Sequence, residues 1–68
     1  MFEKLKKNRI NRNISAEVLA KVLGLETKSA YYKKESGLVK FTLEDAKKLS
    51  EFFGLPIEKI FFADEVSE

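Results

Sequence analysis

Three hydroxyl residues that can cap helices alternate with the three glycines of this chain, and their order constrains the fold more than any other feature of the sequence. Each of the three glycines closes a segment that a serine or threonine opens. The segments open with Ser15, Thr27 and Thr42 and close with Gly24, Gly37 and Gly54, respectively. A hydroxyl side chain is a favoured N-terminal helix cap, and glycine ends helices because it adopts the left-handed conformation without strain. The order therefore predicts three short consecutive helices.

Apolar spacing predicts two further helices, one before and one after these three. The first is expected over residues 2–12, where apolar residues recur at helical spacing from Phe2 onward and Asn13 can adopt the left-handed conformation that ends a helix. The last is expected after Pro56, because proline suits a helix start. The stretch GLVKF reads more easily as a loop than as a strand. The chain should therefore be all-α, with no helix long enough to be stable alone.

The inner faces of these helices supply the expected hydrophobic core. It comprises Leu5, Leu19, Ala20, Leu23, Tyr31, Leu43, Ala46, Leu49, Phe53, Ile57, Ile60 and Phe61. A chain this short buries only about 60% of the surface that it exposes when unfolded, so the core is modest. The last residues are acidic and have no apolar stripe, so we expect one domain over residues 1–63 and an acidic tail over residues 64–68.

The composition excludes several classes of function. The chain has no cysteine and no histidine, and so it lacks disulfides, the usual transition-metal ligands and the commonest general base. No catalytic constellation is assembled in the sequence, and we expect no enzymatic activity, no cofactor and no bound metal. The sequence contains no signal-peptide pattern and no long apolar run, so we expect a cytoplasmic protein with no membrane partner.

The net charge of +2 hides an asymmetry between the two parts of the chain. Residues 1–40 carry ten Lys and Arg against four Asp and Glu, a formal charge of +6, whereas residues 41–68 carry three against seven, a formal charge of −4. A basic front part is what a face that binds a polyanion needs. Uneven charge on a solvated surface, which is common in small proteins, explains the asymmetry equally well.

The segment ISAEVLAKVLGLETKSAYYKKESG resembles the Cro/repressor-type, or XRE-type, helix-turn-helix domain. The shared features are a Leu-Ala pair, a turn glycine, a hydroxyl residue that opens the next helix and a Glu-x-Gly that closes it. They are Leu19-Ala20, Gly24, Thr27 and Glu35-Ser36-Gly37. The segment FTLEDAKKLSEFFGLPIEKIFF resembles the fourth and fifth helices of the family, especially those of short phage and prophage regulators of Gram-positive bacteria. The resemblance spans nearly the whole chain and implies a compact five-helix, lambda-repressor-like fold.

Three positions depart from the family pattern. The turn between Gly24 and Thr27 is one residue longer than the common form, which leaves the register of the next helix open by one residue. Ala16 stands where many members have a glutamine that touches a phosphate. Lys34 occupies a position that is usually apolar.

The helix after Thr27 would be the recognition helix of this family. Ala30 and Tyr31 are expected to face the core, because they lie three and four residues after Thr27. The outer face is then formed by Lys28, Ser29, Tyr32 and Lys33. A recognition helix meets base edges in the major groove, so we expect these four side chains to contact DNA bases. The alternative is a solvated polar face.

Phosphate contacts are expected on both flanks of the recognition helix, from helix N-termini and from the loop that follows it. Ser15 and Ala16 offer the start of the preceding helix, and Lys40 and Thr42 lie in the loop. The resemblance also implies a structural ion pair between Arg9 in the first helix and Glu35 at the end of the recognition helix. We expect this pair to set the angle of the recognition helix rather than to touch DNA.

The leading hypothesis is a sequence-specific, double-stranded DNA-binding transcription regulator, a phage or prophage repressor of the Cro kind. Because one small module makes a limited interface, we expect it to bind DNA as a homodimer. Phe52 and Phe62 are candidates for an apolar dimer patch, although overflow packing of the core explains them equally well.

Two other classes of function remain to be weighed. A helix-turn-helix module can act as an antirepressor that binds a partner phage repressor, and both Ala16 and the acidic second part of the chain are compatible with that role. A basic amphipathic peptide on anionic membranes is disfavoured, because EKLKKNRINR has few large apolar residues.

Overall fold

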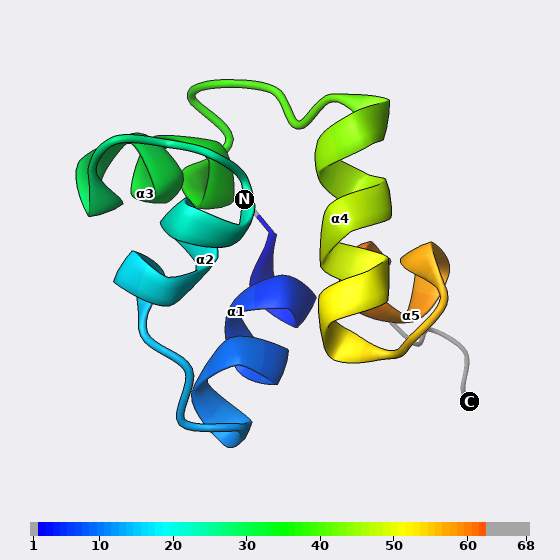
Figure 1. Ribbon diagram of the computed structural model, residues 1–68. Coiled ribbons are helices and arrows are strands. Elements are labelled where there is room, and N and C mark those ends of the chain that lie inside the picture. The colour runs from blue at the N-terminus through cyan, green and yellow to red at the C-terminus, as the bar shows by residue number, and fades with distance from the viewer. Residues whose placement is uncertain (1, 63–68) are drawn as a thin grey trace.

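The computed structural model describes residues 2–62, and this part of the chain is helical throughout, with turns and loops between the helices (Figure 1). The helices are α1 (Glu3–Asn11), α2 (Ala16–Val22), α3 (Lys28–Ser36), α4 (Leu43–Phe53) and α5 (Ile57–Phe61). The all-α prediction is confirmed, and GLVKF lies in the connection between α3 and α4. The acidic tail expected over residues 64–68 lies outside the described residues.

Side-chain caps start the three middle helices at the hydroxyl residues that the sequence indicated. The Ser15 hydroxyl accepts the Val18 amide at 3.2 Å, and the Thr27 hydroxyl accepts the Ala30 amide at 3.1 Å. Thr42 forms a reciprocal capping box with Asp45, in which each side chain accepts the backbone amide of the other residue at 3.0 Å. These local hydrogen bonds explain why the helix starts could be predicted from sequence alone.

Each of the helices α1 to α4 is followed closely by a residue in the left-handed backbone conformation, which few residues adopt, and Gly24 after α2 has φ of 76°. Gly37 ends α3 with φ of 94°, and Gly54 ends α4 with φ of 70°. Asn13, after α1, has φ of 57°, as the sequence also indicated. The left-handed conformation turns the chain sharply after each of these helices.

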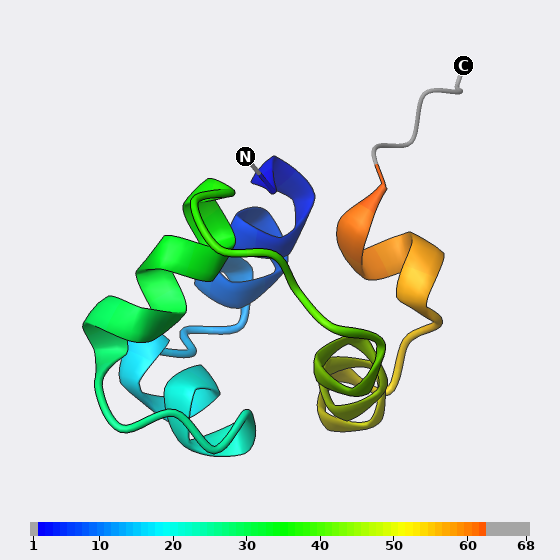
Figure 2. The same ribbon diagram turned by 90° about the horizontal axis from the view of Figure 1, so that it is seen from above.

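The helices surround one hydrophobic core, to which each contributes one fully buried large side chain. These side chains are Leu5, Leu19, Tyr31, Leu49 and Ile60, from α1 to α5 in order. Figures 1 and 2 show α1 between the α2–α3 pair on one side and α4 with α5 on the other. Removal of any one of the five side chains therefore affects the packing of several helices.

One residue predicted to lie in the core is exposed, and three others are only partly buried. Leu43 is 80% exposed, because it lies six residues before the buried Leu49 and so about 120° away from it around the helix axis. Ala46, Ile57 and Phe61 are only partly buried. The remaining predicted core residues are buried, and Ala16 joins them.

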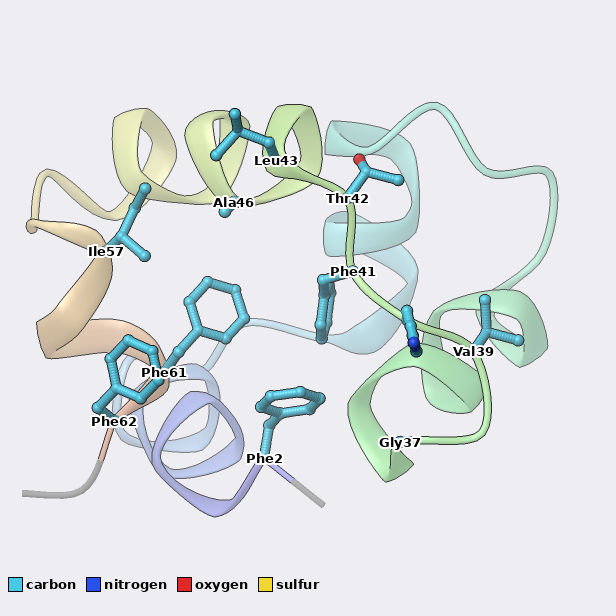
Figure 3. Close-up of a pocket in the computed structure, with 11 residues that line it drawn as sticks. Phe2, Gly37, Val39, Phe41, Thr42, Leu43, Ala46, Ile57, Phe61 and Phe62 are labelled. Carbon is cyan, nitrogen blue, oxygen red and sulfur yellow. The ribbon is translucent and has the colours of Figure 1, made fainter.

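A cluster of three aromatic rings joins the chain start, the α3–α4 connection and α5 (Figure 3). Phe2, Phe41 and Phe61 pack edge to face, with ring centroids between 5.1 and 5.6 Å apart. Such pairs prefer this geometry because the edge of one ring is positive and the face of the other is negative. The cluster fixes the second half of the α3–α4 connection against the body of the domain.

Leu49 and Leu43 provide a matched test of the core, because both are leucines of α4 and only Leu49 is buried. We expect Leu49→Ala to lower the free energy of unfolding by about 2–5 kcal/mol, through lost burial and the cavity that it leaves. Leu43→Ala should change it by less than about 0.5 kcal/mol. Urea unfolding followed by circular dichroism measures both, and equal losses would contradict the placement of α4.

Candidate nucleic-acid interface

The outer face of α3 consists of polar side chains, as the sequence indicated. Lys28, Ser29, Tyr32 and Lys33 are all exposed. Tyr31 is fully buried between them, and Ala30 is partly buried. Figure 2 shows α3 along an outer edge of the molecule, so a long double helix can approach this face. The structure thus presents the four predicted base-contacting residues together, although base contact itself stays a prediction.

A shallow groove of about 360 Å³ runs beside the outer face of α3. Ser29, Tyr32 and Lys33 line it, together with Lys6 from α1 and Leu38 from the following loop. Lys28 does not line this groove. Three of the four outer-face residues therefore share one groove and Lys28 lies outside it, while Lys6 is a groove residue that sequence reasoning did not single out.

The Glu35 carboxylate holds the C-terminal turn of α3 from inside the fold. It receives two hydrogen bonds from the Arg9 guanidinium, from Nε to Oε2 at 3.0 Å and from Nη2 to Oε1 at 3.2 Å. The Tyr31 hydroxyl donates to the same Oε2 at 2.8 Å. The ion pair implied by the family resemblance is therefore present, and Tyr31 is an additional member that sequence reasoning placed only in the core.

The pKa values of Arg9 and Tyr31, which both donate to Glu35, are raised, so both groups stay protonated. The hydrogen bond to Glu35 raises the pKa of Arg9. Burial, and next the hydrogen bond to Glu35, raise the pKa of the Tyr31 hydroxyl far above its usual range. Tyr31 is therefore a neutral donor, and Glu35 has charged and neutral donors to compensate its burial.

A second buried ion pair, between Lys34 and Asp45, joins α3 to the first turn of α4. The Lys34 ammonium lies 2.7 Å from Asp45 Oδ2, and both residues are only 9% exposed. The same ammonium donates to the Lys40 carbonyl oxygen at 3.1 Å. The sequence marked Lys34 as unusual for its position, but no local signal identified Asp45 as its partner.

The environment of Asp45 favours its charged form. Burial raises the pKa of this carboxyl, but hydrogen bonds from Lys34 and from the Thr42 amide outweigh burial, and the net pKa is lowered below its ordinary value of 3.8. Because the folded state thus holds the carboxylate more firmly than the unfolded state does, Asp45 stabilises the fold where it is ionised.

The residues expected to contact phosphates are not equally placed for that role. Ser15, Lys40 and Thr42 are exposed. Ala16 is only 3% exposed and belongs to the core, so the structure leaves it almost no surface for a phosphate. Figure 2 shows the connection that carries Lys40 crossing from the end of α3 to the start of α4.

Phe52 and Phe62 both lie at the surface, with 42% and 62% of their areas exposed. Phe62 lines an apolar cleft of about 620 Å³ (Figure 3). Leu43 lies at the edge of this cleft and points away from the aromatic rings within it (Figure 3). Phe52 does not line the cleft and instead packs edge to face on Phe53, with ring centroids 5.4 Å apart.

The remaining features bear on other classes of site. Within residues 2–62 no group of acidic side chains is arranged to hold a metal ion. No helix in the described part of the chain is long and apolar enough to span a bilayer.

The chain matches a known protein family over most of its length. The model of a family described as helix-turn-helix matches residues 5–60. This range begins and ends at the fully buried Leu5 and Ile60, and thus covers the complete core. No curated protein and no solved structure matches the chain. The matched family consists of DNA-binding regulatory domains and is not typically enzymatic.

The lowered pKa of Asp45 generates a prediction for acid stability. At neutral pH, Asp45→Asn should lower the free energy of unfolding, because it leaves the buried Lys34 ammonium without its counter-charge. The stabilisation by Asp45 is complete above its ordinary pKa of 3.8 and is lost as the pH falls through the lower pKa of the folded state. The difference between wild type and variant should therefore shrink below about pH 3.8.

Urea unfolding of both proteins at a series of pH values from 7 to 2 measures that difference, in which the titration of the other carboxyl groups largely cancels. Glu44→Gln is the matched control, because it removes one charge from the same helical turn at an exposed position. A difference between wild type and Asp45→Asn that stayed constant down to pH 2 would contradict the assignment.

Proposed function

This chain belongs to the XRE-type helix-turn-helix family of DNA-binding transcription regulators, and we propose that it acts as a Cro-like repressor of phage or prophage origin. It would bind double-stranded DNA in a sequence-specific manner, as a homodimer, in the cytoplasm. The observation that carries this proposal is the polar outer face of α3, which is exposed while two buried ion pairs hold the same helix from inside.

The proposed reading of DNA follows from the order of side chains along α3. Lys28 and Ser29 occupy its first turn and would lie deepest in the major groove. A lysine donates to guanine O6 and N7, whereas a serine hydroxyl can donate or accept and so discriminates less between bases. Tyr32 and Lys33, one turn later, would reach a thymine methyl group, a base edge or a phosphate.

The proposed phosphate contacts flank this face. Lys40 and Thr42 are exposed in the connection after α3, and Ser15 is exposed at the start of α2. Phosphate contacts set the register of a protein on DNA but carry no sequence information of their own. We exclude Ala16 from this set, because it is buried.

The proposed homodimer would use the apolar surface around Phe62. A single domain of this size makes a limited DNA interface, and two half-sites supply the missing specificity. Phe62 and Leu43 are exposed at an apolar cleft, which is the kind of surface that monomeric proteins rarely leave uncovered.

The second candidate function is an antirepressor that binds a partner phage repressor through protein contacts. The same apolar cleft favours it, as does the buried Ala16 in place of the phosphate-contacting glutamine of many members. A DNA-binding measurement on the region that flanks the protein's own gene separates the two functions. Absence of binding there and to random DNA would favour the antirepressor.

Lys28 and Lys40 test the proposed division between base and phosphate contacts. Lys28→Ala should weaken binding to the operator more than to random DNA, and relax preference at one base pair by about 1–3 kcal/mol. Lys40→Ala should weaken binding to both DNAs similarly and lower the slope of log affinity against log salt by about one. Fluorescence anisotropy over a salt series measures both effects.

The two variants control for each other, because each removes one exposed lysine and the same net charge. General electrostatic attraction would therefore weaken them alike. Equal losses on both DNAs would show that α3 does not read sequence in the proposed register.

Phe62 tests the proposed dimer. Phe62→Ser should shift the protein toward monomer in analytical ultracentrifugation, because it removes the exposed ring at the cleft. Phe52→Ser is the comparison, since Phe52 is also exposed but lies outside the cleft. If neither variant changes sedimentation at a concentration where the wild type is dimeric, the interface lies elsewhere.

A further inference from the structure

The α3–α4 connection is anchored at one buried ammonium group. Lys34 is 9% exposed although its neighbour Lys33 is exposed, so α3 directs one lysine outward and the next one inward. Burial of a lysine is costly unless its charge is paired and hydrogen-bonded. Lys34 meets this condition through contacts that all lie in the connection or directly after it.

These contacts involve three consecutive residues of the connection. The Lys34 ammonium donates to the Lys40 carbonyl oxygen at 3.1 Å and lies 5.8 Å from the centroid of the Phe41 ring. It also donates to Asp45 Oδ2 at 2.7 Å, and the same oxygen accepts the Thr42 amide at 3.0 Å. Residues 40, 41 and 42 are thus tied to α3 through one side chain.

An apolar side chain could be buried at this position without a counter-charge or hydrogen-bond partners. Replacement of a buried ion pair by well-packed apolar residues is often neutral or even stabilising, so stability alone does not account for Lys34. What an apolar residue cannot supply is directional hydrogen bonding to the Lys40 carbonyl and the Asp45 carboxylate. The specific effect of Lys34 is therefore on where the connection lies.

We propose that Lys34 is a positioning residue for DNA binding, which holds Lys40 and Thr42 at a set place relative to the outer face of α3. The proposal rests on the proposed function, because it gives the held residues their role as phosphate contacts. Lys34 itself is buried, so its proposed effect on DNA binding is exerted through the residues that it holds. A connection that is already ordered before binding loses less conformational freedom on the DNA and so binds more tightly.

A double-mutant cycle on a mixed-sequence DNA duplex tests whether Lys34 acts through Lys40. We expect Lys34→Met, which keeps a long side chain at this site, to weaken binding about threefold or more, on the scale of one phosphate contact. In the Lys40→Ala background, the decrease in log affinity caused by Lys34→Met should be less than half of the decrease in the wild-type background. In the Lys28→Ala background it should remain complete, because Lys28 is not in the connection.

Asp45→Asn separates positioning from net charge. This variant makes the protein more positive, so general attraction to DNA predicts tighter binding. Loss of the partner of Lys34 predicts weaker binding and a smaller salt slope. The proposal would be overturned if the double variant lost affinity by the full product of the two single fold losses, from Lys34→Met and Lys40→Ala. Tighter DNA binding by Asp45→Asn would also overturn it. Circular dichroism and urea unfolding show that every variant is folded at the temperature of these measurements.

Amide hydrogen exchange tests the same contacts without DNA. In Lys34→Met the Thr42 amide should exchange at least several-fold faster, whereas the Val18 amide, capped by Ser15 in α2, should be unchanged. Unchanged exchange at Thr42 would overturn the proposal even if DNA binding were weakened. Absence of DNA binding by the wild type would instead refute the proposed function, and the exchange result would still decide whether Lys34 orders the connection.

Discussion

The arrangement of this domain depends on the Glu35 carboxylate. It accepts hydrogen bonds from Arg9 in α1 and from Tyr31 one turn earlier in α3. The backbone carbonyl of Glu35 accepts the Phe2 amide at 3.0 Å. One residue thus joins the chain start, the first helix and the end of α3. Because a buried carboxylate is costly without donors, these partners hold one another in a single geometry. The position of α3, and of everything that α3 presents to solvent, follows from that geometry.

Polar contacts hold α3 because apolar burial alone cannot. Among its side chains only Tyr31 is large, apolar in its body and fully buried, and most of the others are charged or hydroxylated. The inward-facing charges of Lys34 and Glu35 take the place of an apolar stripe, and each finds a partner on a different helix. The two ion pairs that hold α3 therefore lie on its inner side, away from Lys28, Ser29 and Lys33. In a DNA-binding protein this separation lets the reading residues vary without loss of the fold.

The charge asymmetry of the sequence has a partly structural origin. The basic part of the chain contains α3 and its outer lysines, which is the distribution that a polyanion-binding face requires. However, two of its cations, Arg9 and Lys34, are buried in ion pairs and contribute little to that face. Asp45 likewise serves α3 rather than the acidic surface of the second part. Net charge by region thus overstates the number of lysines and arginines that are exposed on the proposed DNA-binding side.

Local chemistry determined the helices, and the sequence was sufficient to predict them. Caps at Ser15, Thr27 and Thr42 act within one turn, and so their effect does not depend on the rest of the fold. The tertiary structure decided which side chains meet across helices. Lys34 and Asp45 carry no shared local pattern and become partners only when α3 and α4 pack, while Leu43, apolar and near the right spacing, is left outside because Leu49 and Phe53 set the inner face of α4. The sequence pattern of one helix predicts which of its residues share a face. It does not predict which residues of other helices that face contacts, because burial and pairing depend on how the helices pack.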